Sequence, residues 1–295
     1  MRVNPNYTPD LLAALAATQQ EEQKALQEMS TGRRVNIPSD DPTVAAVLVG
    51  NHSRADQADQ FLRSISGIQA ELQTADSTLN SVVLALQRAI SLGVQGANGT
   101  LSDANRASLV GELQGLQQQL TSLANTTFQG SFIFAGTETR TQPFVADATQ
   151  PSGVRYDGNA GVNSVAVGDG FNVQFNLPGS QLFMAAGGNV FQAMHDLILS
   201  LQNNAGIDVA VAGVRQAFDQ VSAQRVFYGN SMNQLSAQQT FLNNSKLALS
   251  EQENQIGGAD LAAAASRLVN AENARNAALA AAARISGTTL FDFLT

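Results

Sequence analysis

Few side chains of this chain could do covalent or metal chemistry, and they do not gather. Its 295 residues include two histidines, His52 and His195, and no cysteine. Catalytic triads and metal sites need several partners at related spacings, whereas each histidine stands alone in a helical context. The absence of cysteine removes disulfides, zinc thiolates and thiol nucleophiles. We therefore expect two surface or packing histidines, no enzyme activity, no metal and no cofactor.

One acidic pair, Asp40-Asp41, is a possible calcium site. Hard cations need oxygen ligands at several spaced positions, and the neighbouring Ile37, Pro38 and Pro42 offer none. Helix capping explains the pair at least as well, because Asp41 can accept from the first amides of a helix that starts at Pro42. No P-loop, G-x-G-x-x-G, H-E-x-x-H or G-x-S-x-G motif occurs in the sequence.

The charge balance disfavours nucleic acid and anionic membranes as partners. The net charge is −8 and the isoelectric point is near 4.7, whereas phosphate binding rests on lysine and arginine. No stretch approaches the roughly twenty apolar residues of a spanning helix. The apolar run from Leu11 to Ala17 is at the lower length limit for a secretory signal, and prolines and an acid precede it, so we expect no cleaved signal peptide. The protein is then soluble, or reaches the cell surface by another export route.

The first half of the chain has helical periodicity. A first helix is expected from about Pro9 to Thr31, with Gly32 as a left-handed cap and a bent connector up to Pro42. A second helix follows, with apolar residues at alternating spacings of three and four that define a heptad seam. The seam comprises Ala58, Phe61, Ile65, Ile68, Leu72, Ala75, Leu79, Val82, Leu86 and Ala89. The pattern breaks at Gly93, Gly96 and Gly99 and resumes from Leu109 to Leu123, after a cap at Ser102 or Asp103.

The middle of the chain consists of short β-prone segments separated by turns that contain glycine. Strands are expected at 132–134, 154–156, 165–167 and 171–175. The Asp157-Gly158 and Gly168-Asp169-Gly170 segments supply turns between them. We interpret this region as a small all-β insertion.

The last part of the chain is helical again. Apolar residues recur every seven positions from Val214 to Ile256, which predicts one helix of about forty-five residues packed on the 58–89 seam. A final helix is expected from Ala259 or Asp260 to Ile285 with a mostly alanine inward stripe, namely Leu261, Ala264, Leu268, Ala271, Ala274, Ala278, Ala281 and Ile285. This helix buries little area, and the first helix carries Gln19 and Glu22 on its seam, so both should be marginal alone.

These patterns predict a mainly α fold with a small all-β insertion. Both chain ends would build a long antiparallel helical bundle or coiled coil, with the β domain at its tip. We expect three domains: residues 1–42 with 258–295, residues 43–130 with 190–257, and residues 131–189.

One segment carries a family resemblance. Residues 26–42, LQEMSTGRRVNIPSDDP, resemble the amino-terminal signature of the bacterial flagellin family. Its motif residues here are Gly32, Arg33, Arg34, Asn36, Asp40, Asp41 and Pro42. Residues 128–144 and 287–294 are similar to the branch of that family found at the hook-filament junction.

The resemblance implies a structural junction or adaptor protein that joins hook-associated protein 1 to the flagellin filament. It implies export by the flagellar type III apparatus with a cytoplasmic chaperone, self-association in a ring, and terminal helices that fold as they assemble. Two alternatives stay open: a minor filament flagellin, and a non-flagellar secreted coiled-coil binding module.

Apolar residues near both ends are the candidate subunit interface. They are Leu11, Leu12, Leu15, Leu26, Met29, Leu261, Leu268, Leu279, Ile285, Leu290, Phe291 and Phe293. A simpler interpretation, compatible with the first, is that the two ends pair with each other within one subunit.

Overall fold

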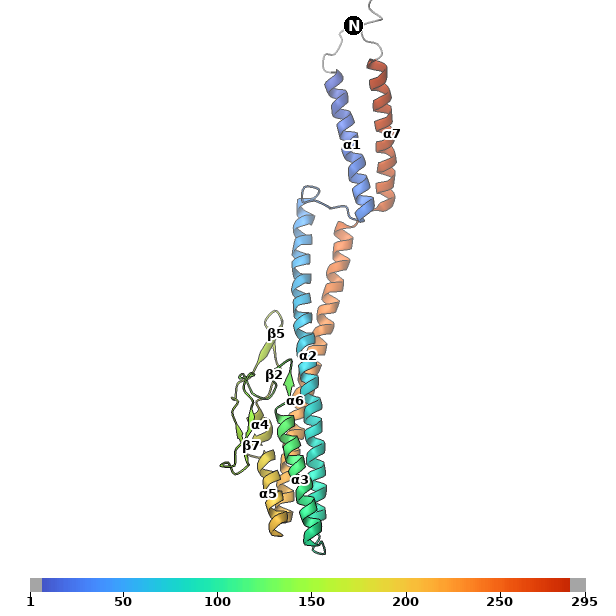
Figure 1. Cartoon of the computed structure of the whole chain (residues 1–295). Coiled ribbons are helices and arrows are strands. Elements are labelled where there is room, and N and C mark those ends of the chain that lie inside the picture. The colour runs from blue at the N-terminus through green and yellow to red at the C-terminus, as the bar shows by residue number, and fades with distance from the viewer. Residues whose placement is uncertain (1–6, 287–295) are drawn as a thin grey trace, which may run out of the picture. The chain divides into compact units, whose positions relative to one another are not determined.

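The computed structural model describes residues 7–286, with side chains for residues 9–283. It divides into two compact units, one made of residues 1–57 and 244–295 and the other of residues 58–243. We call them the terminal unit and the central unit. The fold is mainly α with a small set of short strands, as the sequence predicts (Figure 1). No described helix is long and apolar enough to span a bilayer.

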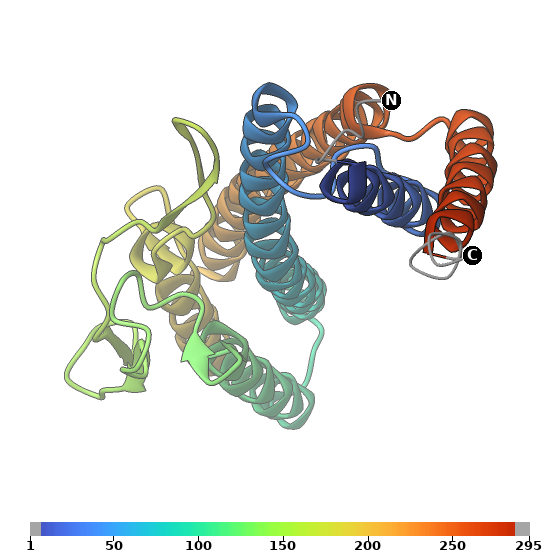
Figure 2. The same ribbon diagram turned by 90° about the horizontal axis from the view of Figure 1, so that it is seen from above.

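The terminal unit contains two helices from opposite ends of the chain. Helix α1 (Tyr7–Thr31) packs beside α7 (Leu261–Ser286), and the two views show them side by side (Figure 1, Figure 2). The start of α2 (Pro42–Gly96) and the end of α6 (Ile207–Gly257) belong to the same unit. Gly32 has a φ of +68° and its amide donates to the Glu28 carbonyl at 2.9 Å, so the expected left-handed cap ends α1.

The central unit is built on the rest of α2 and α6. Most of the heptad positions predicted on both helices are buried there, including Ile65, Leu72 and Leu79 on α2 and Val214 and Leu235 on α6. Helix α3 (Asp103–Ala124), capped by the Ser102 hydroxyl as expected, packs against α5 (Val190–Asn203). At 51 residues, α6 is slightly longer than the pattern indicated.

The predicted break before the next helix is confirmed at Gly99, which lies in a turn, but it is wrong at Gly93 and Gly96, because α2 continues to Gly96. A β-carbon added to Gly93 would lie 2.5 Å from Cγ2 of Val211, and one added to Gly96 would lie 2.2 Å from Cδ2 of Leu201. The glycines therefore admit side chains of α5 and α6 into the surface of α2.

The β insertion consists of four separate antiparallel pairs. The pairs are β1 (Thr127–Phe128) with β2 (Ser131–Phe132), β3 (Phe144–Ala146) with β4 (Val154–Tyr156), β5 (Ser164–Gly168) with β6 (Phe171–Gln174), and β7 (Met184–Ala185) with β8 (Gly188–Asn189). The short helix α4 (Gly179–Phe183) precedes β7. Three predicted strands are confirmed, but the one at 132–134 extends only through Phe132.

An aromatic cluster attaches the insertion to α5. Phe144 lies at its centre, with ring centroids 5.4 Å from Phe183, 5.2 Å from Phe191 and 5.1 Å from Tyr156. Phe134, expected in a strand, lies in a turn with its ring 5.3 Å from that of Phe183. Phe134 therefore adopts the turn conformation that buries its ring in this cluster and not the expected strand, because an aromatic ring buries a large apolar area.

Candidate functional site

The seam between α1 and α7 consists mainly of small side chains. Ala25, Ala264 and Ala271 are buried, whereas Leu11 and Leu268 are only half-buried. Alanine offers little apolar area to remove from water, so this seam stabilises the pair modestly.

Two ion pairs cross the same seam. Glu28, almost fully buried, binds Arg267 through both carboxylate oxygens, and Glu22 accepts from Arg275 at 2.8 Å. The acid nearer the end of α1 pairs with the arginine nearer the start of α7, as antiparallel helices require. The sequence contained the signal, acids on one terminal helix and arginines on the other, but the sequence analysis did not use it.

Large apolar side chains remain exposed on both terminal helices. Leu12 has 65% of its surface in contact with solvent. The exposed set, which we call the terminal apolar face, comprises Leu12, Leu26, Met29, Leu261, Val269 and Leu279. Single exposed apolar side chains are ordinary, whereas six on two helices that pack together make a candidate interaction surface.

The predicted interface residues thus divide into two groups. Leu11, Leu15 and Leu268 are half-buried, whereas Leu12, Leu26, Met29, Leu261 and Leu279 are exposed. The prediction that Leu261 and Ala274 lie on the inward stripe is wrong, because both are exposed, and Arg275 takes the seam position beside Ala271. Gln19 is likewise exposed, whereas Glu22 lies on the seam. The side chain of Ile285, together with Leu290, Phe291 and Phe293, lies outside the described residues.

The connector from Gly32 to Asp41 joins the ends of α1, α6 and α7. Arg33 pairs with Gly258 as an isolated antiparallel bridge, and the Ala259 amide donates to the Gly32 carbonyl at 2.9 Å. The Arg34 amide donates to the Gly257 carbonyl at 2.8 Å. The Arg34 guanidinium binds the carbonyl of Ile256 at the end of α6.

The remaining motif residues close the connector on itself. Asp40 accepts from the amides of Asn36 at 3.0 Å and Ile37 at 3.1 Å, and the Asn36 side chain donates to the Arg33 carbonyl. Those two amides, Ile37 first, hold the pKa of Asp40 below its usual value, with a smaller contribution from Lys24. Asp41 caps α2 by accepting from the Val44 amide at 3.1 Å, and Pro42 takes the first helical position as expected.

Comparison with known proteins identifies this architecture. Residues 6–139 match the bacterial flagellin N-terminal helical region, and residues 211–294 match the bacterial flagellin C-terminal helical region. This chain belongs to the bacterial flagellin family. Bacterial flagellins are a structural family, not an enzyme family.

Among flagellin-family relatives, the chain is 40% identical to flagellar hook-associated protein 3 of Escherichia coli over 134 residues, which cover 45% of this chain and 42% of that protein. It is 26% identical to flagellin D of Vibrio anguillarum over 218 residues, or 72% of this chain and 55% of the relative. The chain thus matches less than half the length of the first relative.

Solved structures share the fold of this flagellin-family chain. A putative flagellar hook-associated protein from Vibrio parahaemolyticus superposes with a TM-score of 0.69 at 22% identity, covering 74% of this chain and all of that one. The flagellar junction protein of Legionella pneumophila superposes with a TM-score of 0.63 at 15% identity, covering 72% of this chain and 99% of that one.

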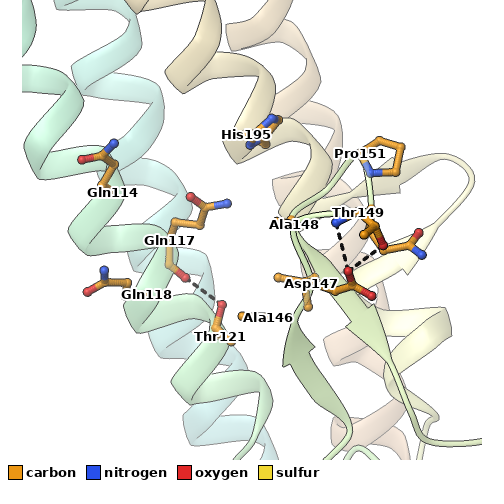
Figure 3. A pocket seen from close by; sticks show the side chains of 13 residues that line it. Gln114, Gln117, Gln118, Thr121, Ala146, Asp147, Ala148, Thr149, Pro151 and His195 are labelled. Carbon is orange, nitrogen blue, oxygen red and sulfur yellow. Dashed lines mark hydrogen bonds between the residues drawn. The ribbon is translucent and has the colours of Figure 1, made fainter.

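The two histidines of this flagellin-family protein lie apart. His52 is exposed and contacts Glu253 at 3.2 Å. His195 lines a cleft between α3 and the β3–β4 hairpin, opposite Gln117 (Figure 3). The acid of that cleft, Asp147, accepts from the amide and hydroxyl of Thr149. No group of three or more potential metal ligands occurs among residues 7–286.

Proposed function

We propose that this chain is a structural junction protein of the bacterial flagellum, placed between the hook and the filament. The observation that carries the proposal is the terminal apolar face beside the alanine seam. A helix pair that buries so little apolar area in its own seam, and leaves leucines outside, is suited to packing against further helices. The similarity to hook-associated protein 3 supports the junction as the place where such packing occurs.

Folding of the terminal helices would be coupled to assembly. Helix α1 has 25 residues and α7 has 26. Fixing each backbone residue costs about 1 to 2 kcal/mol, and the alanine seam offsets this less than a leucine core would. Burial of the terminal apolar face between neighbouring subunits supplies the remaining stabilisation, so ordering and association would occur together.

The proposed partners are other flagellar subunits. Copies of this chain would associate laterally in a ring, with hook-associated protein 1 on the hook side and flagellin on the filament side. Delivery would use the flagellar type III export apparatus and a cytoplasmic chaperone. The net charge of −8 argues against nucleic acid as a partner.

A gene deletion tests the junction role. In the bacterium of origin, cells without the gene should carry hooks without filaments and release flagellin into the medium, and the wild-type gene should restore attached filaments. Filaments that remain attached without the gene would refute the junction role. The similarity to flagellin D over 72% of the chain makes a minor flagellin the second candidate, and long homopolymers of the purified protein would favour it.

Variants of the terminal apolar face test the mechanism. Leu26→Ser with Leu279→Ser should leave thermal unfolding of the central unit unchanged and abolish restoration of filaments. Ala14→Ser with Ala277→Ser, at exposed alanines of the same helices, is the matched control and should restore filaments.

Proteolysis tests the coupling of folding to assembly: protease should cut the purified monomer early before about residue 40 and after about residue 258. Protection of both ends in a demonstrated monomer would contradict it.

A further inference from the structure

A second potential contact site lies on the central unit. A cleft of about 400 Å³ opens beside α2, where the β1–β2 turn and strand β5 approach it. Ile68, Phe128 and Val165 supply apolar lining, and Gln129 and Glu71 supply polar groups. Gln129 has a φ of +49°, a left-handed conformation that few residues other than glycine adopt.

Glu71 is the unusual member of this lining. It is half-buried, yet it forms no hydrogen bond or ion pair with any residue that the structure describes. Every other buried or half-buried carboxylate of the described part has a partner. Those carboxylates are Glu22, Glu28, Asp40, Asp41, Asp59, Asp76, Asp147, Asp157 and Glu253.

No cation among the described residues pairs with the Glu71 carboxylate. Desolvation raises the pKa of Glu71. Arg63 lines the same cleft, but it precedes Glu71 by eight residues on one helix, about 12 Å along the axis. Arg225, a cation at a heptad position of α6, is engaged by Asp76 at 3.0 Å.

An unpaired, half-buried acid in an open cleft lowers the stability of the free chain. Burying a charge without a partner costs free energy, and a glutamine would avoid that cost. Such locally unfavourable groups concentrate at functional sites, because the compensating partner arrives with the ligand. The cleft offers the complement of a long basic side chain: apolar walls for the methylenes, and a carboxylate with a side-chain amide for the charged end.

We propose that this cleft receives a lysine or arginine side chain of a neighbouring protein subunit, with Glu71 as its counter-ion. The proposal rests on the proposed function, since assembly brings the neighbour into place. It adds a specific ionic contact of the central unit to the apolar packing of the terminal helices.

The experiment compares Glu71→Gln with a matched acid-to-amide control, Glu112→Gln, on α3. Glu112 is exposed and pairs with Arg88 at the surface, so its replacement should change little. Each variant is expressed in the deletion strain, and the copies retained in purified appendages are counted by quantitative immunoblot against wild type. The melting temperature of each purified monomer is measured in parallel.

We expect Glu71→Gln to melt at or above the wild-type temperature and to be retained about tenfold less, the loss that one charge-assisted contact can cause. Glu71→Lys should be retained less still, because it places like charges together. Glu112→Gln should match wild type in both measurements.

Three outcomes would overturn the proposal: normal retention of Glu71→Gln, a lower melting temperature that explains its loss, or equal retention of the glutamine and lysine variants. If the wild-type gene itself proves unnecessary for attached filaments, the junction role fails instead. The two failures are therefore distinguishable.

Discussion

Arg34 and Ile256 are 222 residues apart in the sequence, and Nη2 of Arg34 donates to the Ile256 carbonyl oxygen at 3.0 Å. The final carbonyls of a helix have no intrahelical donors, and the helix dipole favours a cation there. The same guanidinium pairs with Asp41 at 3.3 Å, the residue that caps α2. Arg34 thus links the end of α6 to the start of α2 within the terminal unit.

Arg34→Ala should loosen the connector without unfolding the central unit. The lost hydrogen bonds are partly exposed, so we expect a local cost of about 1 kcal/mol. Hydrogen exchange of the amides between Arg33 and Asp41 should accelerate about fivefold, while exchange in the α2 and α6 core stays the same. Arg33→Ala is the control, since Arg33 contributes main-chain bonds that the variant retains. Equal exchange in both variants would show that the guanidinium is not what holds the connector.

The connector should also respond to acid. Backbone amides lower the pKa of Asp40, and of Asp41 through its cap on Val44. Because these folded-state pKa values lie below the unfolded ones, the stabilisation is present above the unfolded values, near pH 4, and is lost as pH falls through the folded values.

The rate of proteolysis between Gly32 and Asp41 should therefore be higher below about pH 4 than at neutral pH. Asp40→Asn cannot supply the ionised acceptor, so its cleavage should be faster at neutral pH and less dependent on pH in the acid range. A wild-type cleavage rate that stays constant from pH 7 to pH 3 would contradict this assignment.

The helical part of the fold could be predicted because its signals are local or strictly periodic. Leucine and valine at heptad spacing define the faces of α2 and α6 that become buried, and Gly32 and Ser102 define helix ends by cap chemistry. The contacts of Arg34 could not be predicted in this way. Its partner is a main-chain carbonyl on a distant helix, and nothing in the sequence distinguishes that carbonyl from others.

The predictions of a helix break at Gly93 and of a strand at 132–134 were wrong for related reasons. Gly93 reads as a helix breaker locally, but tertiary packing overrides the propensity when a neighbour needs the space. Phe132-Ile133-Phe134 has strand composition, yet burial of Phe134 in the aromatic cluster decides its conformation. The apolar residues of the candidate interface could be identified from the sequence. Which of them face the α1–α7 seam and which face outward depends on how each helix is rotated about its axis. The Glu22–Arg275 and Glu28–Arg267 pairs fix that rotation.

Gly93→Ala should destabilise the central unit although alanine is the better helix former. The added methyl would lie 2.5 Å from Val211, a stiff β-branched side chain, and 3.1 Å from Leu197. Overpacking costs about 1 to 3 kcal/mol, which exceeds the gain in propensity of about 1 kcal/mol. Gly115→Ala on α3 has open space around it and should be neutral or stabilising by up to about 1 kcal/mol. Urea unfolding of both variants gives the comparison, and stabilisation by Gly93→Ala would mean that α5 and α6 do not pack against α2 as described.

Arg267→Ala should weaken the α1–α7 pair more than Arg275→Ala does. Glu28 is almost fully buried beside Arg267, so removing Arg267 leaves this carboxylate without its counter-ion, at a cost of about 1 to 3 kcal/mol. Glu22, the partner of Arg275, is only half-buried and can be hydrated, which makes its loss smaller.

The readout is the rate of proteolysis within residues 9–31 and 261–283 of the monomer, together with the helical content by circular dichroism. Adding Glu28→Gln to Arg267→Ala should recover part of the lost order, because the double variant buries no charge. If the double variant is as disordered as Arg267→Ala alone, the ion pair stabilises the terminal helices by its geometry and not by neutralising a buried acid.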